Sequence, residues 1–254
     1  IGDGGQWNMF VNVVNKHGLV PKSAMPETES SSCTAKMNMI LRWKLRDGAM
    51  QCRDAGENVE EVRKEVLSGI WRILCIHLGT PPTSFNWQWQ DKEKEFTRKG
   101  EMTPLEFAAE YIETPLDEYV CVVNDPRPAN TYMNTYTVEC LGNVIGGELV
   151  KYLNVDTETM KSLTQKMLED SKPVWMGCDV GKMFRRDIGI WDAALFDFES
   201  VYGTQLGLTK ADRLEYHQTL MTHAMLFTGV DVHDGVATKW RVENSWGDDA
   251  LGVK

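Results

Sequence analysis

The chain has 254 residues, of which 42% are hydrophobic, and a formal net charge of −10. These values are typical of a globular protein with one large domain or two smaller ones. The acidic balance argues against a nucleic-acid-binding surface that dominates the chain. The sequence also contains no apolar run long enough to cross a membrane. Because the chain starts with Ile1 and no signal peptide is recognisable, we expect it to begin inside a longer polypeptide.

The first part of the sequence is predicted to be mainly helical. A glycine loop leads into a helix that we expect to end at Gly18. Apolar residues at intervals of three to four predict a second helix over residues 34–48 and a third over residues 58–78, with Asn58 as its N-cap. The segment 85–100 mixes aromatic and charged residues, and we expect it to fold over the surface of a larger body. Thr103-Pro104-Leu105-Glu106 predicts another helix start with a capping box.

Strands are predicted to dominate the later part of the chain. Two helices interrupt them, a longer one over residues 156–170 and a short capped one over residues 209–217. The expected strands cover residues 119–123, 131–139, 173–180, 221–232 and 236–243. With helices concentrated early and strands late, the predicted class is α+β with a β-rich C-terminal half.

The six cysteines are far apart in the sequence. They are Cys33, Cys52, Cys75, Cys121, Cys140 and Cys178, and no two of them form a Cys-x-x-Cys pair. Since a chain of this size does not need disulfides, we interpret them as reduced thiols of a cytoplasmic protein. Their spacing does not suggest a structural zinc site, and the sequence implies no metal or other cofactor.

One histidine and one later asparagine suggest catalytic chemistry. His223 lies on an apolar run, and Asn244 opens the sequence Asn-Ser-Trp-Gly at the end of the next run. In a cysteine protease the imidazole exchanges a proton with a thiol, while an asparagine carbonyl accepts from the other ring nitrogen and fixes the tautomer. The indole of Trp246 would shield that hydrogen bond from water. Twenty-one residues separate His223 from Asn244 (244 − 223), which is enough for a strand, a turn and a return strand.

Each signal has an ordinary structural interpretation when it is taken alone. A single histidine in a strand is usually structural, and Asn-Ser-Trp-Gly can be a turn whose Trp246 packs in a core. Trp87 and Trp89 could stack on bases, although packing against protein is the more common role. The order and spacing of His223 and Asn244 together favour the catalytic interpretation.

The chain resembles the bleomycin hydrolase family, the cytoplasmic papain-like aminopeptidases called aminopeptidase C in bacteria. The resemblance covers nearly the whole chain and rests on five segments. They are Asp3-Gly4-Gly5-Gln6-Trp7, Asn124-Asp125-Pro126-Arg127, Trp175-Met176-Gly177-Cys178-Asp179-Val180-Gly181, Leu220-Met221-Thr222-His223-Ala224-Met225 and Arg241-Val242-Glu243-Asn244-Ser245-Trp246-Gly247. By this resemblance His223 is the general base and acid, Asn244 orients it, and the backbone of Gly4 and Gly5 lines the substrate cleft. A simple turn remains the alternative for the two glycines.

The resemblance also implies parts that this chain does not contain. The family's nucleophilic cysteine, in a Gly-x-Cys-Trp context, and its oxyanion-hole glutamine lie upstream of the segment that matches Ile1. The C-terminal tail that restricts cleavage to the N-terminal residue has no counterpart after Gly247. Cys178 and Cys33 lack the nucleophile's context, and we interpret them as a buried structural thiol and a loop thiol. We therefore expect an internal fragment of a longer enzyme.

The same resemblance predicts three domains and a ring. Residues 1–33 belong to the papain-like helical subdomain, 34–150 to an inserted helical arm, and 151–254 to the papain-like β subdomain. The arm implies a homohexamer that encloses its active sites. The expected function is removal of N-terminal residues from peptides and hydrolysis of the bleomycin amide. Two alternatives stay open: a non-catalytic scaffold or binding subunit that retains the fold, and a nucleic-acid-binding ring, which the net charge does not favour.

Overall fold

The chain folds into two compact units. A computed structural model describes residues 5–245. The first unit comprises the residues up to Glu118 together with Asn143–Glu148, and the second comprises Tyr119–Gly142 and the residues from Leu149 onward. The predicted limits at residues 33 and 150 describe papain-like subdomains rather than compact units, and they remain a prediction. None of the helices within residues 5–245 combines the length and apolar character that a membrane span requires.

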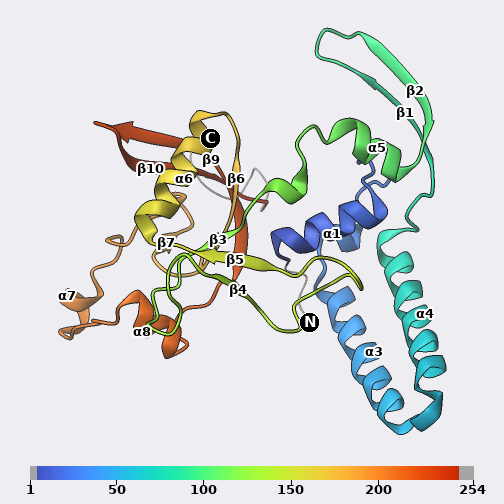
Figure 1. Cartoon of the computed structure of the whole chain (residues 1–254), viewed down its shortest axis with the longest axis horizontal. Coiled ribbons are helices and arrows are strands. Elements are labelled where there is room, and N and C mark those ends of the chain that lie inside the picture. Colours follow the sequence, from blue (N-terminus) through green and yellow to red (C-terminus); the bar gives the residue numbers. More distant parts are fainter. Residues whose placement is uncertain (1–4, 246–254) are drawn as a thin grey trace. The chain divides into compact units, whose positions relative to one another are not determined.

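The first unit is mainly helical (Figure 1). Its elements are α1 (Trp7–His17), α2 (Glu29–Ser32), α3 (Ala35–Asp54), the 3-10 turn η1 (Gly56–Asn58), α4 (Val59–Leu78), β1 (Phe85–Gln90), β2 (Phe96–Met102), α5 (Pro104–Tyr111) and the 3-10 turn η2 (Leu116–Glu118). The helices α3 and α4 lie side by side and are joined by η1. Asn58 occupies the N-cap position of α4 as predicted, although its side chain makes no capping hydrogen bond.

The end of α3 corrects the prediction that this helix stops at Gly48. The helix continues to Asp54, and Gly48 is one of its buried residues. A Cβ atom at this position would lie 2.4 Å from Cγ1 of Val66 on α4. Gly48 is therefore a point of close helix approach, which a glycine permits because it has no side chain.

The segment 85–100, for which the sequence predicted no secondary structure, forms most of a β-hairpin. β1 and β2 pair antiparallel, and three aromatic side chains alternate with polar ones along β1. The Phe85 ring packs edge-on against Phe107 of α5 at 5.5 Å, and the Trp87 ring packs against the same residue at 5.3 Å. The Trp87 indole also donates a 2.8 Å hydrogen bond to the hydroxyl of Tyr111. The α5 start has the predicted capping box, in which the Thr103 side chain accepts from the Glu106 amide.

The second unit contains most of the strands. Its elements are β3 (Val122–Val123), β4 (Thr135–Thr137), β5 (Lys151–Asn154), α6 (Thr157–Glu169), β6 (Val174–Cys178), β7 (Phe184–Arg185), β8 (Ile190–Trp191), α7 (Phe198–Tyr202), α8 (Lys210–Glu215), β9 (His223–His233) and β10 (Val236–Glu243). They form three sheets with the strand orders β3-β5-β4, β10-β9-β6 and β7-β8. The helix α6 packs against β6 and β9.

Two strands of the second unit are shorter than predicted. In place of the strands expected over residues 119–123 and 131–139 the structure has β3 and β4, and each of them pairs with β5. In α6 the N-cap carboxylate of Asp156 accepts from the Thr159 amide. On this helix the apolar Leu163 is 45% exposed, whereas Thr164 is buried.

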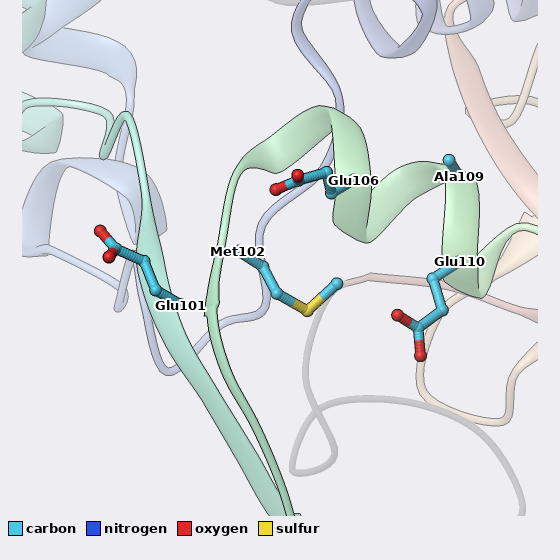
Figure 2. Close-up of a pocket in the computed structure, with 5 residues that line it drawn as sticks. All are labelled: Glu101, Met102, Glu106, Ala109 and Glu110. Carbon is cyan, nitrogen blue, oxygen red and sulfur yellow. The ribbon is translucent and has the colours of Figure 1, made fainter.

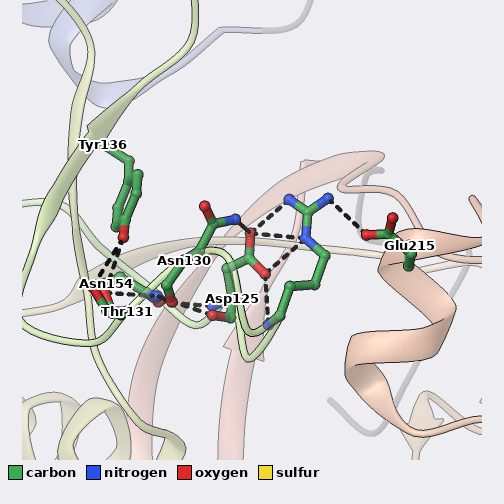
Figure 3. Close-up of polar contacts among 7 residues, drawn as sticks. Asp125, Asn130, Thr131, Tyr136, Asn154 and Glu215 are labelled. Atoms are coloured by element: carbon green, nitrogen blue, oxygen red, sulfur yellow. Dashed lines mark hydrogen bonds and ion pairs between the residues drawn. The ribbon is translucent and has the colours of Figure 1, made fainter.

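A buried asparagine organises the loop between β3 and β4 (Figure 3). Asn154 is completely buried at the end of β5. Its Oδ1 accepts from the Asp125 amide at 2.8 Å, and its Nδ2 donates to the carbonyls of Asp125 and Asn130 at 2.9 and 2.8 Å. The Asp125 carboxylate in turn accepts from the guanidinium of Arg127 at 2.7 Å, which holds the pKa of this carboxyl below its usual value. The motif Asn-Asp-Pro-Arg therefore has a structural role here.

Candidate active site

His223 and Asn244 come from adjacent strands of one antiparallel hairpin. His223 is the first residue of β9, and Asn244 directly follows the last residue of β10. Glu243 pairs with Leu226, so continuing this register places Asn244 opposite Met225. Met225 and His223 are two residues apart and share a face of the sheet, which makes Asn244 a diagonal neighbour of His223. The structure thus brings the two predicted residues together.

The register of this hairpin depends on two compensating bulges. Between Ala237 and Lys239 the strand β10 has one extra residue, Thr238, and between Gly229 and Phe227 the strand β9 has one extra residue, Thr228. A single extra residue would move every later side chain of its strand to the opposite face. Because each strand carries one, the register near His223 is the same as at the hairpin turn. The Thr238 hydroxyl donates to Asp231 at 3.0 Å and 3.1 Å, which stabilises the first bulge.

The hydrogen bonds of Asn244 define the tautomer of the imidazole. Nε2 of His223 lies 2.9 Å from Oδ1 of Asn244. The amide of Ser245 donates to the same Oδ1 at 2.8 Å, so the atom facing both groups is the oxygen. An amide oxygen only accepts hydrogen bonds, and therefore Nε2 of His223 carries a hydrogen. In the neutral ring the basic lone pair is then on Nδ1, the nitrogen that exchanges a proton with a nucleophile in a triad of this kind.

The other predicted site residues are only partly described. Trp246 and Gly4 lie outside the described residues. Gly5 is exposed, and among residues 5–245 a Cβ atom added to it would meet no atom within 4 Å beyond its chain neighbours. Its backbone is therefore open to an approaching chain.

Cys178 is the register partner of His223 across the β6–β9 pair. Burial, together with the charge of the neighbouring Asp179, raises the pKa of the Cys178 thiol to about 11. At neutral pH almost all of it is protonated, and the thiol is a much weaker nucleophile than the thiolate. This environment supports the interpretation of Cys178 as a structural thiol. Within residues 5–245, no group of three or more His, Cys, Asp or Glu side chains is arranged to hold a metal ion.

The first unit contains an open pocket with an acidic lining (Figure 2). It has a volume of about 510 Å³ and is lined by Glu101, Met102, Glu106, Ala109 and Glu110. The three carboxylates already have partners within this unit. Glu101 accepts from the Ser84 hydroxyl, Glu106 completes the α5 capping box, and Glu110 pairs with Lys99. We therefore do not assign the pocket a catalytic role.

Three polar residues beside the site received no role from the sequence. The Thr222 amide donates to the Cys178 carbonyl at 2.9 Å, and the Thr219 hydroxyl donates to the Asp179 carboxylate at 2.8 Å. Both threonines lie just before His223 in the chain. Asp179 and Thr222 each lie in one of the segments that carry the family resemblance. Their place in these segments is the sequence signal that could have identified them.

Comparisons with known proteins identify the relatives of this chain. The family described as Peptidase C1-like matches residues 1–254. Human bleomycin hydrolase is 42% identical over 259 residues, which cover 97% of this chain and 57% of that protein. Aminopeptidase C of Lactococcus lactis is 42% identical over 252 residues, covering 98% of this chain and 58% of that protein.

A solved structure shows the same fold. The crystal structure of PepW from Lactobacillus rhamnosis matches 99% of this chain with a TM-score of 0.95 and 41% sequence identity. The match covers 58% of that chain. The α+β class and the papain-like fold expected from the sequence are therefore confirmed. The chain spans a little over half the length of these relatives.

Proposed function

The chain belongs to the Peptidase C1-like family, and from this premise we propose that it forms the part of a cysteine aminopeptidase that carries the catalytic base. The observation that carries the proposal is the hydrogen bond between His223 and Asn244 across the β9–β10 hairpin. Relatives named bleomycin hydrolase and aminopeptidase C, at 42% identity each, support the same activity.

In the proposed mechanism His223 moves one proton in each half of the reaction. A cysteine thiolate outside this chain attacks the carbonyl carbon of the first peptide bond, while His223 is an imidazolium. Nδ1 of His223 then donates its proton to the leaving amine as the C–N bond breaks. In the second half, neutral His223 takes a proton from water, the hydroxide attacks the thioester, and the C–S bond breaks. This step releases the acid and restores the thiolate–imidazolium pair.

Asn244 and the remaining predicted residues have supporting roles. Because Oδ1 of Asn244 binds the Nε2 hydrogen in both protonation states, the ring keeps its orientation while Nδ1 exchanges protons. Trp246 is proposed to shield this hydrogen bond. The backbone of Gly4 and Gly5 is proposed to line the cleft for an extended peptide, which accords with the open surroundings of Gly5.

The substrate proposal is peptides with a free N-terminus, with the bleomycin amide as a second substrate. We propose a cytoplasmic location, which accords with the six free thiols. We propose neither a nucleic-acid partner nor a membrane partner. The net charge of −10 disfavours binding to nucleic acid.

Substitution of His223 in the intact protein that contains this chain tests the proposal. We expect His223→Ala to lower kcat/KM on a fluorogenic aminoacyl amide by about 10³-fold or more, because both proton transfers lose their carrier. The matched control is His233→Ala, at the exposed far end of the same strand, which should change kcat/KM by less than about two-fold. Intact mass spectrometry should also detect one adduct of an epoxide thiol-protease inhibitor per wild-type chain.

Two outcomes would contradict the proposal. One is that the His223→Ala variant hydrolyses the substrate as fast as the wild type. The other is an intact wild-type protein with neither turnover nor adduct, which would favour the alternative of a non-catalytic scaffold or binding subunit.

Self-association, expected as a homohexameric ring, is part of the same proposal. The α3–α4 pair exposes large apolar side chains, namely Met39, Trp43, Met50, Leu67, Trp71 and Ile76. Such a surface is typical of a face that is covered in an assembly. We expect Ile76→Lys to reduce the assembly size in sedimentation velocity, whereas Ile145→Lys, at an even more exposed isoleucine outside the pair, should not. A monomeric wild type, or equal effects of both variants, would contradict self-association through this surface.

A further inference from the structure

The segment that leads into His223 has neither helix nor strand structure. Residues 216–222 connect the end of α8 to the first residue of β9, and the last four of them, 219–222, have no assigned secondary structure. A catalytic histidine at the first position of a strand depends on this segment for its backbone position. In a segment without its own secondary structure, that position has to come from contacts with neighbouring elements.

The Thr219 amide donates to the Arg213 carbonyl of α8 at 3.1 Å, and the other contacts that hold this segment come from one short stretch. The Thr222 amide donates to the Cys178 carbonyl at 2.9 Å, and the Val180 amide donates to the Thr222 hydroxyl at 3.3 Å. A Cβ atom at Gly177 would lie 2.2 Å from the sulfur of Met221, so that this side chain occupies the space beside the glycine. The segment thus follows the end of β6 and the residues after it.

The contact between Thr219 and Asp179 completes this attachment through side chains. The Thr219 hydroxyl donates to Oδ2 of Asp179 at 2.8 Å, and Lys182 pairs with the same carboxylate. The Asp179 side chain is only 15% exposed. Burial acts to raise the pKa of this carboxyl, but the hydrogen bonds from Lys182 and Thr219, the charge of Lys182 and a hydrogen bond from the Leu220 amide outweigh it, and the pKa lies below its usual value. Asp179 is therefore an anion held in one place, and it binds the segment four residues before His223.

We propose that Asp179 is a positioning residue for His223, acting through Thr219. This inference rests on the proposed function, because it concerns the alignment of the same imidazole. Proton transfer requires the two heavy atoms to be within hydrogen-bond reach and well aligned, and a displacement of about 1 Å costs on the order of 10²-fold in rate. Asn244 fixes Nε2 from one strand, while the Asp179–Thr219 contact fixes the backbone that carries the ring. Neither residue touches the substrate carbonyl in this assignment.

The test compares Thr219→Val with Thr219→Ser in the intact enzyme. Valine keeps the shape of threonine but cannot donate a hydrogen bond, whereas serine retains the hydroxyl. We expect Thr219→Val to lower kcat by about 10-fold with KM within about two-fold, because alignment rather than substrate binding is lost. Thr219→Ser should restore most of the rate. Asp179→Asn should lower kcat in the same way, and the double variant Asp179→Asn/Thr219→Val should be no slower than the slower single variant.

A matched control separates this role from the general loss of a surface ion pair. Asp187 pairs with Arg185 in the turn between β7 and β8 of the same unit. Asp187→Asn should leave kcat and KM within about two-fold of wild type. The proposal would be overturned if Asp187→Asn lowered kcat as much as Asp179→Asn does. It would also be overturned if the fold-decrease in kcat of the double variant equalled the product of the two single decreases.

A readout that does not depend on activity distinguishes failure of this inference from failure of the proposed function. With histidine labelled by ¹⁵N, the ring nitrogens of His223 report its protonation and hydrogen bonding, and their signals can be assigned by comparison with His223→Ala. We expect the wild type to show one set of imidazolium signals, with both ring nitrogens protonated, and Thr219→Val to show exchange between more than one ring environment. An unchanged His223 spectrum in Thr219→Val overturns the positioning role, whether or not the enzyme is active. Absence of peptidase activity in the wild type contradicts the proposed function alone.

Discussion

The α3–α4 pair of the first unit and the sheets of the second unit are held together in different ways. Along the two helices only Met37, Gly48 and Val66 are buried, and their order comes largely from local helical hydrogen bonds. In the second unit, buried or half-buried polar side chains connect segments that are far apart in the sequence, as Asn154 does for the loop at Asp125. Local order suffices for a surface that packs against a partner, whereas a catalytic pair needs distant segments fixed to each other.

Two buried asparagines, one in each unit, test this difference most strongly. Asn154→Ala removes an acceptor and two donor bonds from the loop of the second unit, and we expect it to lower the free energy of unfolding by about 3 kcal/mol. Asn12→Ala in the first unit removes two bonds with the Glu148 backbone, and we expect a loss of about 1–2 kcal/mol. Urea denaturation measures both values.

Hydrogen exchange shows which part of the chain each asparagine substitution destabilises. Asn154→Ala should increase exchange in the loop 124–131, and Asn12→Ala should increase it near residues 143–148. A smaller loss for Asn154→Ala than for Asn12→Ala would show that the second unit does not depend more on its buried polar contacts.

A pair of glycines tests how closely the two helices approach. The Cβ atom in Gly48→Ala would overlap the Val66 side chain, and we expect a net loss of about 1–2 kcal/mol despite the better helix propensity of alanine. In Gly69→Ala the nearest atom is Cε of Lys44 at 3.3 Å, on a flexible side chain, so we expect a gain of about 0.5–1 kcal/mol. Thermal unfolding should separate the two variants. If Gly48→Ala also stabilises, the helices are not closely packed at this point.

The smallest expected effect is a pH dependence from Cys178. Burial raises its pKa from about 9 to about 11, so the folded chain holds this proton more tightly than the unfolded chain. The resulting stability is fully present below about pH 9 and is lost as the pH rises through 11. We expect the unfolding free energy of the wild type to fall more steeply between these pH values than that of Cys178→Ala. Parallel curves would show that the thiol is not desolvated.

Most elements could be predicted from the sequence because their signals are local. Helix periodicity and caps gave the starts of α4, α5 and α6 within one or two residues, and alternation gave the limits of β10. The sequence did not predict the hairpin of β1 and β2, although Phe85, Trp87 and Trp89 alternate with polar residues, because the mixed aromatic and charged composition of the segment obscures the period of two. The end of α3 was missed because a glycine that serves packing looks in sequence like a glycine that ends a helix.

The sequence by itself determined the family, the fold class and the identity of the candidate pair, because the motifs around His223 and Asn244 are long and occur in a fixed order. Only the tertiary structure decided how that pair meets. The compensating bulges set the register of the hairpin, and the Asp179–Thr219 contact joins segments 40 residues apart. Such relations depend on which backbone groups pair across the sheet, and no local propensity specifies a pairing between distant strands.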